Sequence, residues 1–365
     1  MKIGILGGGQ LAQMLALAGI PLGYRFVFYD PSPDCCAAAL GEHIQADYDD
    51  WQQLQTFAES VDLATFEFEN VPLAAVNFVA EHCTLYPKTN ALEATQDRWV
   101  EKQLFRRLDI PTPQFVNIKN RADLTQAAEC LGYPLVLKSR FGGYDGKGQI
   151  VIKSAQQLEQ AWLELSGQPY IVEQWIRFSR EVSIIAVRNL SGEMVFYDLA
   201  ENIHRSGILQ TTLNRPGDTL LQQAQGYVHR LMEELDYCGV LTLEFFQIGD
   251  ELLANEFAPR VHNSGHWTIE GAAVSQFENH LRAILNLPLG QTTRLAYCAM
   301  INFVGVLPAM NELLTIPDSH YHQYGKQPKP GRKLGHLTIR SDQPETLENL
   351  AQRVVSQISL LASQV

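Results

Sequence analysis

The stretch LVLKSRFGGYDGKGQ, residues 135–149, decides which kind of fold this chain can adopt. Its first three residues are apolar and predict a buried strand, which ends near Lys138. Four glycines follow within seven positions, and residues 149–153 predict a second strand. Glycine N–H groups beside Lys138 and Lys147 can approach phosphate oxygens closely. We therefore expect a flap over a phosphorylated ligand, with a flexible hairpin tip as the alternative.

The spacing of this loop separates it from two other phosphate-binding loops. A Walker loop continues from its last glycine into Lys and then Ser or Thr, but Gly148 is followed by Gln149. A dinucleotide loop leads into a helix, whereas residues 149–153 predict a strand. The motif that remains consists of a strand, a glycine loop and a second strand.

The composition limits the possible functions. With 365 residues, 46% of them hydrophobic, the chain can bury two or three cores. A net charge of −12 argues against a nucleic-acid or anionic-membrane partner. Six scattered cysteines without a C-x-x-C pair indicate a reducing compartment. Because neither a signal peptide nor a long apolar run is present, we expect a cytoplasmic protein without a membrane segment.

The first thirty residues predict a βαβ unit with a glycine turn. Gly7, Gly9 and Ala12, with Asp30 at the end of the second strand, match the dinucleotide fingerprint. Alone, this pattern would indicate an NAD-dependent oxidoreductase; the alternative is another anion at the start of the helix.

Further along, the acids and the amide of residues 67–70 follow a predicted strand at 63–66, where open α/β sheets bind ligands. Here Asn70 has a second interpretation, as a helix N-cap.

Two acids face each other in a predicted hairpin at residues 239–257. With the turn near Gly249 and Asp250, Glu244 lies roughly opposite Glu256. Opposed carboxylates among apolar residues repel unless a cation lies between them. Oxygen ligands in a nucleotide context favour Mg²⁺ shared with phosphates, and the alternative is a solvated acidic face.

The loop after this hairpin, residues 258–268, is unusually polar. It holds Arg260, two histidines, Asn, Ser and Thr, and predicts the wall of a polar pocket. Zinc binding by His262 and His266 is disfavoured, because Ser264 and Gly265 break the helix that would align them.

Two further segments carry candidate ligand contacts. The strand at 170–176 predicts an adenine-binding edge, where Glu173 accepts from the amino group of the base; an ordinary strand end is the alternative. Residues 326–336 form the one dense basic cluster, which predicts a site for a phosphorylated substrate or else a solvated hairpin. A lone histidine such as His204 is more often a structural hydrogen-bonder than a catalyst.

Taken in order, these features resemble the ATP-grasp ligases. Within them, four segments look like those of the N5-carboxyaminoimidazole ribonucleotide synthetases: residues 69–72 (ENVP), 143–149 (GYDGKGQ), 255–268 (NEFAPRVHNSGHWT) and 330–336 (PGRKLGH). The resemblance covers nearly the whole chain, and the long NSGHWT motif is the most specific part.

The resemblance implies an α/β and α+β fold in three parts. An N-terminal Rossmann-like parallel-sheet domain would span residues 1–95. An ATP-grasp domain would span 96–290, with a mobile lid subdomain at about 113–175. A small β-rich domain at 291–365 would complete the substrate site.

The resemblance also implies a reaction of de novo purine biosynthesis. ATP would phosphorylate bicarbonate to carboxyphosphate, and 5-aminoimidazole ribonucleotide would capture the carboxyl group with the help of Mg²⁺ or Mn²⁺. A homodimer and a separate mutase that receives the product are expected. The rivals are a sister ATP-grasp ligase such as the formate-dependent glycinamide ribonucleotide transformylase, an NAD-dependent oxidoreductase, and a nucleotide-sensing module without turnover.

The same resemblance implies roles for individual residues. The expected ATP-binding residues are Arg98, Lys138, Gly143, Tyr144, Asp145, Gly146, Lys147, Gly148, Gln149, Glu173, Gln174, Trp175, Ile176, Glu181, His204, Asn255 and Glu256. Glu244 and Glu256 would hold the metal. The ribonucleotide would meet Glu69, Tyr144, Asp145, Lys326 and Arg332, with its phosphate against the last two. The expected catalytic residues are Asp145, Lys147, Arg260 and Lys326. Of these, Asp145 would accept hydrogen from the amine and Arg260 would steady carboxyphosphate. Arg180 departs from the family pattern, which has a small residue there.

Overall fold

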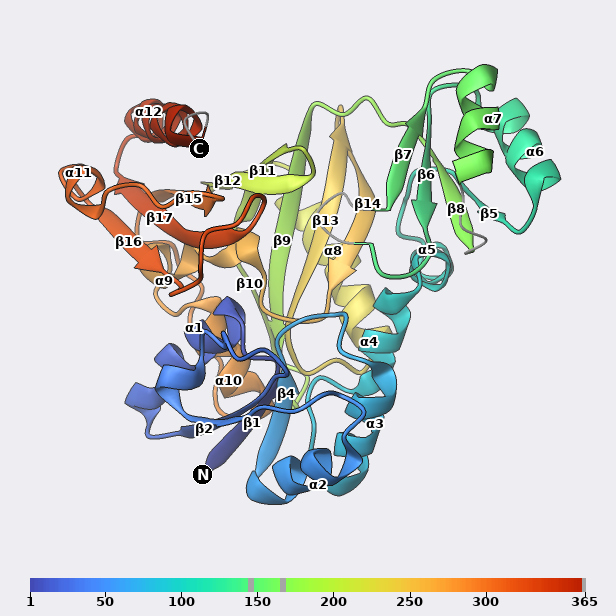
Figure 1. Ribbon diagram of the computed structural model, residues 1–365. Helices are drawn as coiled ribbons and strands as arrows, with labels where there is room; N and C mark the ends of the chain where they lie inside the picture. The colour runs from blue at the N-terminus through green and yellow to red at the C-terminus, as the bar shows by residue number, and fades with distance from the viewer. Residues whose placement is uncertain (144–147, 165–168, 363–365) are drawn as a thin grey trace.

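The computed structural model describes residues 1–143, 148–164 and 169–362, and these form three β-sheets (Figure 1). Four residues with predicted roles, Tyr144, Asp145, Gly146 and Lys147, lie outside the described residues. In the described part, no helix is both long and apolar enough to cross a membrane.

The first sheet belongs to the N-terminal domain. Its four parallel strands have the order β3-β2-β1-β4, namely β3 (Glu42–Ile44), β2 (Arg25–Tyr29), β1 (Lys2–Leu6) and β4 (Leu63–Phe66). The helices of this domain are α1 (Gln10–Gly19), α2 (Trp51–Ser60) and α3 (Leu73–His82). Strands β1, β2 and β4 are almost entirely apolar, as expected for a parallel sheet covered on both faces. The predicted Rossmann-like unit is confirmed.

The second sheet forms the lid, which projects from the rest of the molecule (Figure 1). Its order is β5-β8-β6-β7, with β5 (Phe115–Ile118), β8 (Tyr170–Gln174), β6 (Leu135–Ser139) and β7 (Gln149–Ile152). The helices α6 (Arg121–Leu131) and α7 (Ala155–Glu164) pack with it. Lys138 pairs with Gln149 across the antiparallel β6–β7 ladder, so the two strands predicted on either side of the glycine loop are confirmed.

The third sheet has nine strands and runs through the ATP-grasp and C-terminal parts of the chain. Its main path is β14 (Glu251–Ala258), β13 (Gly239–Ile248), β9 (Arg180–Arg188), β11 (Leu199–Arg205), β12 (Ile208–Arg215), β15 (Tyr297–Val304), β17 (Lys333–Ser341) and β16 (Ser319–Gln323). The ninth strand, β10 (Met194–Phe196), pairs with β9. Because β12 pairs with β15, the C-terminal strands extend the central sheet.

The remaining helices cover this sheet and connect its parts. They are α4 (Thr89–Gln96), α5 (Arg98–Arg107), α8 (Leu221–Glu234), α9 (Thr268–Gly271), α10 (Gln276–Ile284), α11 (Met310–Leu313) and α12 (Pro344–Ala362). The parallel first sheet and the largely antiparallel others confirm the predicted mixture of α/β and α+β structure.

Two local predictions are wrong. The sequence of residues 269–286 predicts one continuous helix, but α9 ends at Gly271 and α10 begins at Gln276, with the Ser275 side chain accepting from the backbone N–H of Glu278. A serine cap of this kind starts a new helix. Asn70 is not a helix N-cap, because α3 begins three residues later, after Pro72.

The buried side chain of His280 joins the N-terminal domain to the central sheet. Its Nδ1 accepts from the Val240 backbone N–H on β13 at 3.1 Å, and its Nε2 lies 3.0 Å from Thr65 Oγ1 on β4. Since Nδ1 is an acceptor, the neutral ring carries its proton on Nε2. Burial lowers the pKa of His280 from 6.5 to about 3.

This lowered pKa predicts a contribution to acid sensitivity. The unfolded chain binds a proton at this position below about pH 6.5 and the folded chain does not, so the contribution of His280 is lost as pH falls. Between pH 8.0 and 5.5 the loss from this one group is about 1.4 kcal/mol. We expect His280→Asn to be less stable at pH 8.0, and its free energy of unfolding to fall by about 1.4 kcal/mol less than wild type over this range.

Urea denaturation at the two pH values measures this difference. The matched control is His229→Asn on the exposed face of α8, which should keep the wild-type pH dependence. An equal fall in the free energy of unfolding of wild type and His280→Asn would contradict the lowered pKa of His280.

Candidate active site

A cleft of about 910 Å³ lies between the lid, the central sheet and the N-terminal domain. Strands β6, β8, β9, β11, β13 and β14 contribute to its walls. The predicted residues that line it are Glu69, Arg98, Lys138, Gly143, Gln149, Glu173, Gln174, Trp175, Ile176, Glu181, His204, Glu244, Asn255, Glu256 and Arg260. Residues that are far apart in sequence are thus brought to one cavity.

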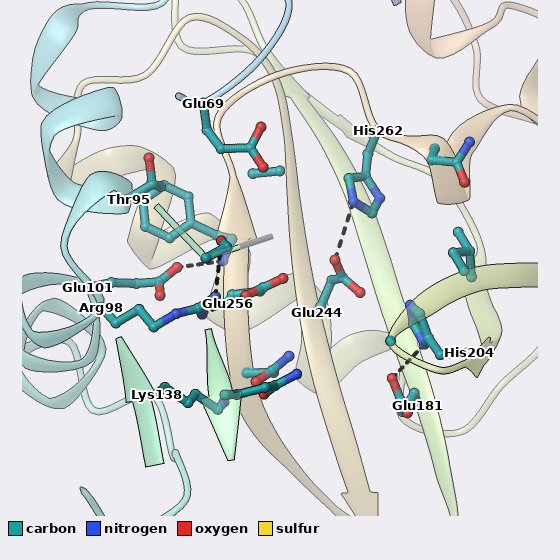
Figure 2. Close-up of a pocket in the computed structure, with 18 of the residues that line it drawn as sticks. Glu69, Thr95, Arg98, Glu101, Lys138, Glu181, His204, Glu244, Glu256 and His262 are labelled. Carbon is teal, nitrogen blue, oxygen red and sulfur yellow. Dashed lines mark hydrogen bonds and ion pairs between the residues drawn. The ribbon is translucent and has the colours of Figure 1, made fainter. Parts of the chain in front are cut away.

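The opposed acids of the hairpin are present. Glu244 and Glu256 are register partners on β13 and β14, as predicted. Each already has a partner within the protein: Arg98 Nη1 lies 2.9 Å from Glu256 Oε2, and His262 Nε2 lies 3.2 Å from Glu244 Oε1 (Figure 2). Burial alone would raise the pKa of Glu244, but His262, His204 and Arg260 lower it to about 2.

The donor set of this pair fits Mg²⁺ better than zinc. Both side chains offer carboxylate oxygens, which hard divalent cations prefer. Within the described residues there is no group of three or more His, Cys, Asp and Glu side chains that would hold a metal by itself. A cation at Glu244 and Glu256 would therefore need further ligands from water or a substrate, as Mg²⁺ often takes from phosphates.

Glu173 lies between two lysines. Its Oε2 is 2.8 Å from Lys138 Nζ and its Oε1 is 3.6 Å from Lys102 Nζ, with the Glu173 side chain only 2% exposed. Burial opposes ionisation, but the two ammonium groups hold the pKa of Glu173 at about 2. Lys138 donates to Glu173 Oε2, whereas the buried Oε1 has no hydrogen-bond partner within the described residues, so the role of Glu173 as an acceptor for the amino group of a base stays a prediction.

Two more pairs line opposite ends of the cleft. At one end, Glu181 Oε2 lies 2.7 Å from His204 Nδ1 (Figure 2). Burial alone would lower the pKa of His204, but the hydrogen bond to Glu181 and the nearby carboxylates raise it. At the other end, Arg260 binds both carboxylate oxygens of Glu69 through Nε and Nη2. This bidentate pair holds the pKa of Glu69 at about 2 against the effect of burial.

The glycine turn of the N-terminal domain is filled by the protein's own carboxylates. Glu67 accepts from the backbone N–H groups of Gly9 and Ala12, and Asp30 Oδ2 accepts from Gly8 N at 2.8 Å. A Cβ atom on Gly9 would lie 2.6 Å from Glu67 Oε1, so a glycine is needed for this close approach. These N–H groups are the ones that a dinucleotide phosphate would use, and the arrangement weighs against an NAD site.

Lys326 and Arg332 do not line the main cleft. Lys326 Nζ donates to Gln10 Oε1, and Gln10 itself faces the cleft. Arg332 Nη1 donates to the backbone oxygen of Gln327 at 3.2 Å. From the same basic cluster, Lys333 reaches the cleft wall. Gly148, in the glycine loop, is also not among the lining residues.

Three lining or supporting residues were not singled out from the sequence: Gln10, Glu101 and Lys102. Lys102 had a usable signal, because it lies four residues after Arg98 and thus on the same face of a helix. Glu101 is marked as a candidate by its burial, and burial cannot be read from the sequence. Its Oε1 accepts from Phe257 N at 2.8 Å, and burial together with the charge of Glu256 raises its pKa to about 8.

Comparison with protein-family models divides the chain into three matched segments. Residues 1–96 match the ribonucleotide synthetase preATP-grasp domain, and residues 103–277 match the ATP-grasp domain. Residues 298–350 match the phosphoribosylaminoimidazole carboxylase C-terminal domain.

Similar proteins extend over nearly the full chain. An N5-carboxyaminoimidazole ribonucleotide synthase from Pseudomonas aeruginosa is 51% identical over 95% of this chain and 97% of its own length. One from Vibrio cholerae is 41% identical over 94% of this chain and 91% of its own.

Solved structures agree with these relatives. The crystal structure of N5-carboxyaminoimidazole ribonucleotide synthetase from Thermus thermophilus superimposes with a TM-score of 0.93 at 48% identity, covering 96% of this chain and 97% of its own. The Aspergillus clavatus enzyme in complex with ADP and 5-aminoimidazole ribonucleotide gives a TM-score of 0.90 at 30% identity, covering 98% of both chains. The chain therefore belongs to the N5-carboxyaminoimidazole ribonucleotide synthase family of ATP-grasp enzymes.

Proposed function

We propose that this chain is an ATP-dependent ligase that carboxylates 5-aminoimidazole ribonucleotide to N5-carboxyaminoimidazole ribonucleotide in purine biosynthesis. The observation that carries the proposal is one continuous cleft with a nucleotide-binding end and an acceptor end. The first end has Lys138, the segment 173–176 at the end of β8 and the Glu181–His204 pair, and the second end has the Arg260–Glu69 pair. The carboxylate pair Glu244 and Glu256 lies on the same cleft.

The chemistry requires an activated carboxyl group. Bicarbonate is a poor electrophile, and transfer of the terminal phosphoryl group of ATP to one of its oxygens creates a leaving group. Fixed cations in a cavity that excludes water stabilise the charge of this transfer. Arg98, Lys138 and Arg260 are such cations, and each is oriented by a carboxylate.

The acid pair would hold the divalent ion. Bound there, Mg²⁺ or Mn²⁺ would neutralise charge on the ATP phosphates. Arg98 and His262 hold the two carboxylates from outside the pair, so the side chains are oriented before any ion arrives.

The remaining assignments rest on the family resemblance and on position. Asp145 would take the proton that leaves the amine, and Lys147 would meet phosphate from the glycine loop. Lys326 and Arg332 would hold the phosphate of the ribonucleotide, where Gln10 links Lys326 to the cleft. The glycine loop over the cleft would protect labile carboxyphosphate from water. The domain boundaries stated above, a homodimer and transfer of the product to a separate mutase belong to the same proposal.

The assay that tests this function compares ADP formation with each substrate omitted. We expect a turnover that depends on both 5-aminoimidazole ribonucleotide and bicarbonate. A turnover that needs glycinamide ribonucleotide and formate would indicate the sister ligase, and ATP binding without turnover would indicate a nucleotide sensor. Titration with NAD should show no binding, because Glu67 and Asp30 fill the glycine turn.

Removal of one charge from the acid pair should abolish nucleotide turnover. Glu256→Gln keeps the shape of the side chain but deletes half of the carboxylate charge available to the ion and breaks the ion pair with Arg98. We expect kcat for ADP formation to fall by about 100-fold or more, as for loss of a directly charged transition-state partner. The matched control, Glu251→Gln, changes an exposed acid on the same strand and should leave kcat unchanged. Wild-type turnover in Glu256→Gln would refute the metal assignment.

Loss of the proposed phosphate contact should affect one substrate selectively. We expect Arg332→Ala to raise KM for 5-aminoimidazole ribonucleotide by roughly tenfold, the usual size of a charged hydrogen bond, with little change in KM for ATP. Lys329→Ala removes an exposed charge from the same hairpin and should change neither constant by more than about twofold. Equal effects of Arg332→Ala on both KM values would rule out a phosphate site at Arg332.

A further inference from the structure

A chain of buried polar side chains runs from the central sheet to His262. It passes through Thr212 on β12, Asn202 on β11, Ser183 on β9 and Ser264 in the loop after β14. Thr212 Oγ1 donates to Asn202 Oδ1 at 2.9 Å, and Asn202 Nδ2 donates to Ser183 Oγ at 2.9 Å. Ser183 Oγ lies 2.8 Å from Ser264 Oγ, which lies 2.8 Å from His262 Nδ1. We refer to these four residues as the relay.

The direction of the relay follows from groups that can only donate. The backbone N–H of Ser264 points at His262 Nδ1 at 3.3 Å, and a backbone N–H cannot accept. His262 Nδ1 is therefore an acceptor, and the proton of the neutral ring is on Nε2. At the other end, the amide of Asn202 donates to Ser183, which leaves the Ser183 hydroxyl proton free to point at Ser264. The Ser264 hydroxyl in turn donates to His262, so every bond in the relay points the same way.

Burial makes this direction costly to reverse. Ser183, Ser264 and Thr212 are 0% exposed and Asn202 is 4% exposed. A buried donor or acceptor left without a partner costs about 1–3 kcal/mol. If Nδ1 were protonated, its N–H would face the N–H of Ser264, and the hydroxyls of Ser264 and Ser183 would have to turn.

The relay ends at the acid pair. The Nε2–H of His262 faces Glu244 Oε1 at 3.2 Å (Figure 2). Glu244 is also the register partner of Ser183 across β13 and β9. An imidazole that donates to a carboxylate fixes its orientation, in the way that outer partners orient metal ligands.

We propose that Thr212, Asn202, Ser183 and Ser264 are positioning residues that hold His262 as an Nε2–H donor and thereby orient Glu244 for the divalent ion. The role of Glu244 rests on the proposed function, whereas the tautomer of His262 does not.

The first test needs no variant. In metal-free protein labelled with ¹⁵N-histidine, we expect the His262 signals of a ring protonated on Nε2 and unprotonated on Nδ1. A ring protonated on Nδ1 would overturn the proposal. This measurement is independent of catalysis, so an inactive enzyme with an Nε2–H ring would contradict the proposed function and leave the relay intact.

The second test breaks the relay at two distances from His262. Ser264→Ala removes the 2.8 Å donor to Nδ1, and Ser183→Ala removes the partner of Ser264. We expect Ser264→Ala to keep the Nε2–H tautomer, because the backbone N–H of residue 264 still faces Nδ1, but to hold the ring less firmly and to weaken Mn²⁺ binding, measured by electron paramagnetic resonance with ADP present, by about tenfold. Ser183→Ala should have a smaller effect in the same direction.

Thr242→Val is the matched control. Thr242 is a fully buried hydroxyl two residues before Glu244, and its Oγ1 has no hydrogen-bond partner in the described part of the chain. Its replacement should leave both the tautomer and Mn²⁺ affinity unchanged. If Ser264→Ala bound Mn²⁺ as tightly as Thr242→Val, the relay would not be what positions His262.

Discussion

The repulsion between Glu244 and Glu256 is the constraint on which the active site depends. Two carboxylates that face each other on adjacent strands destabilise a sheet unless positive charge lies close by. The chain supplies that charge with Arg98 at the start of α5 on one side of the pair, and on the other side His262, after β14, donates its Nε2–H to Glu244. Glu244 is held by a loop that packs on β9, and Glu256 by the helix that precedes the lid. The acid pair can therefore form only when these segments have docked.

The sequence predicted the elements whose signals are local. The βαβ start, the strands around the glycine loop and the hairpin at 239–257 all have clear periodicity and turn residues. Even in this hairpin, counting residues from the turn does not give the correct strand register. With Ile248 opposite Glu251, simple counting places Glu244 opposite Asn255; a bulge after Glu244 shifts the partner to Glu256. The ion pair of Arg98 with Glu256 spans 158 positions, and the β12–β15 pairing joins two predicted domains. No periodic pattern records such long-range contacts.

The N-terminal glycine turn shows why a correct motif can suggest the wrong ligand. Gly7, Gly9 and Ala12 do form the tight turn and helix start that the fingerprint predicts. What decides the ligand is Glu67, more than fifty residues away, whose carboxylate accepts two of the N–H groups that a phosphate would bind. Burial raises the pKa of Glu67, while these two hydrogen bonds and Lys326 oppose that rise. The same backbone geometry thus serves to fix a protein side chain next to the basic cluster.

Lys102 connects strand β8 of the lid to strand β14 of the central sheet. Its fully buried ammonium donates to the backbone oxygen of Asn255 at 2.7 Å, directly before Glu256, and lies 3.6 Å from Glu173 in the lid. Burial lowers the pKa of Lys102, and Glu173 opposes this by favouring the charged form. If the lid moved away from Lys102, Glu173 would keep Lys138 as its one lysine partner and Lys102 would lose its nearby carboxylate. A buried charge without a partner of opposite charge destabilises the protein. The cost of separating these charges favours a lid that keeps residues 173–176 and the acid pair in a fixed relation.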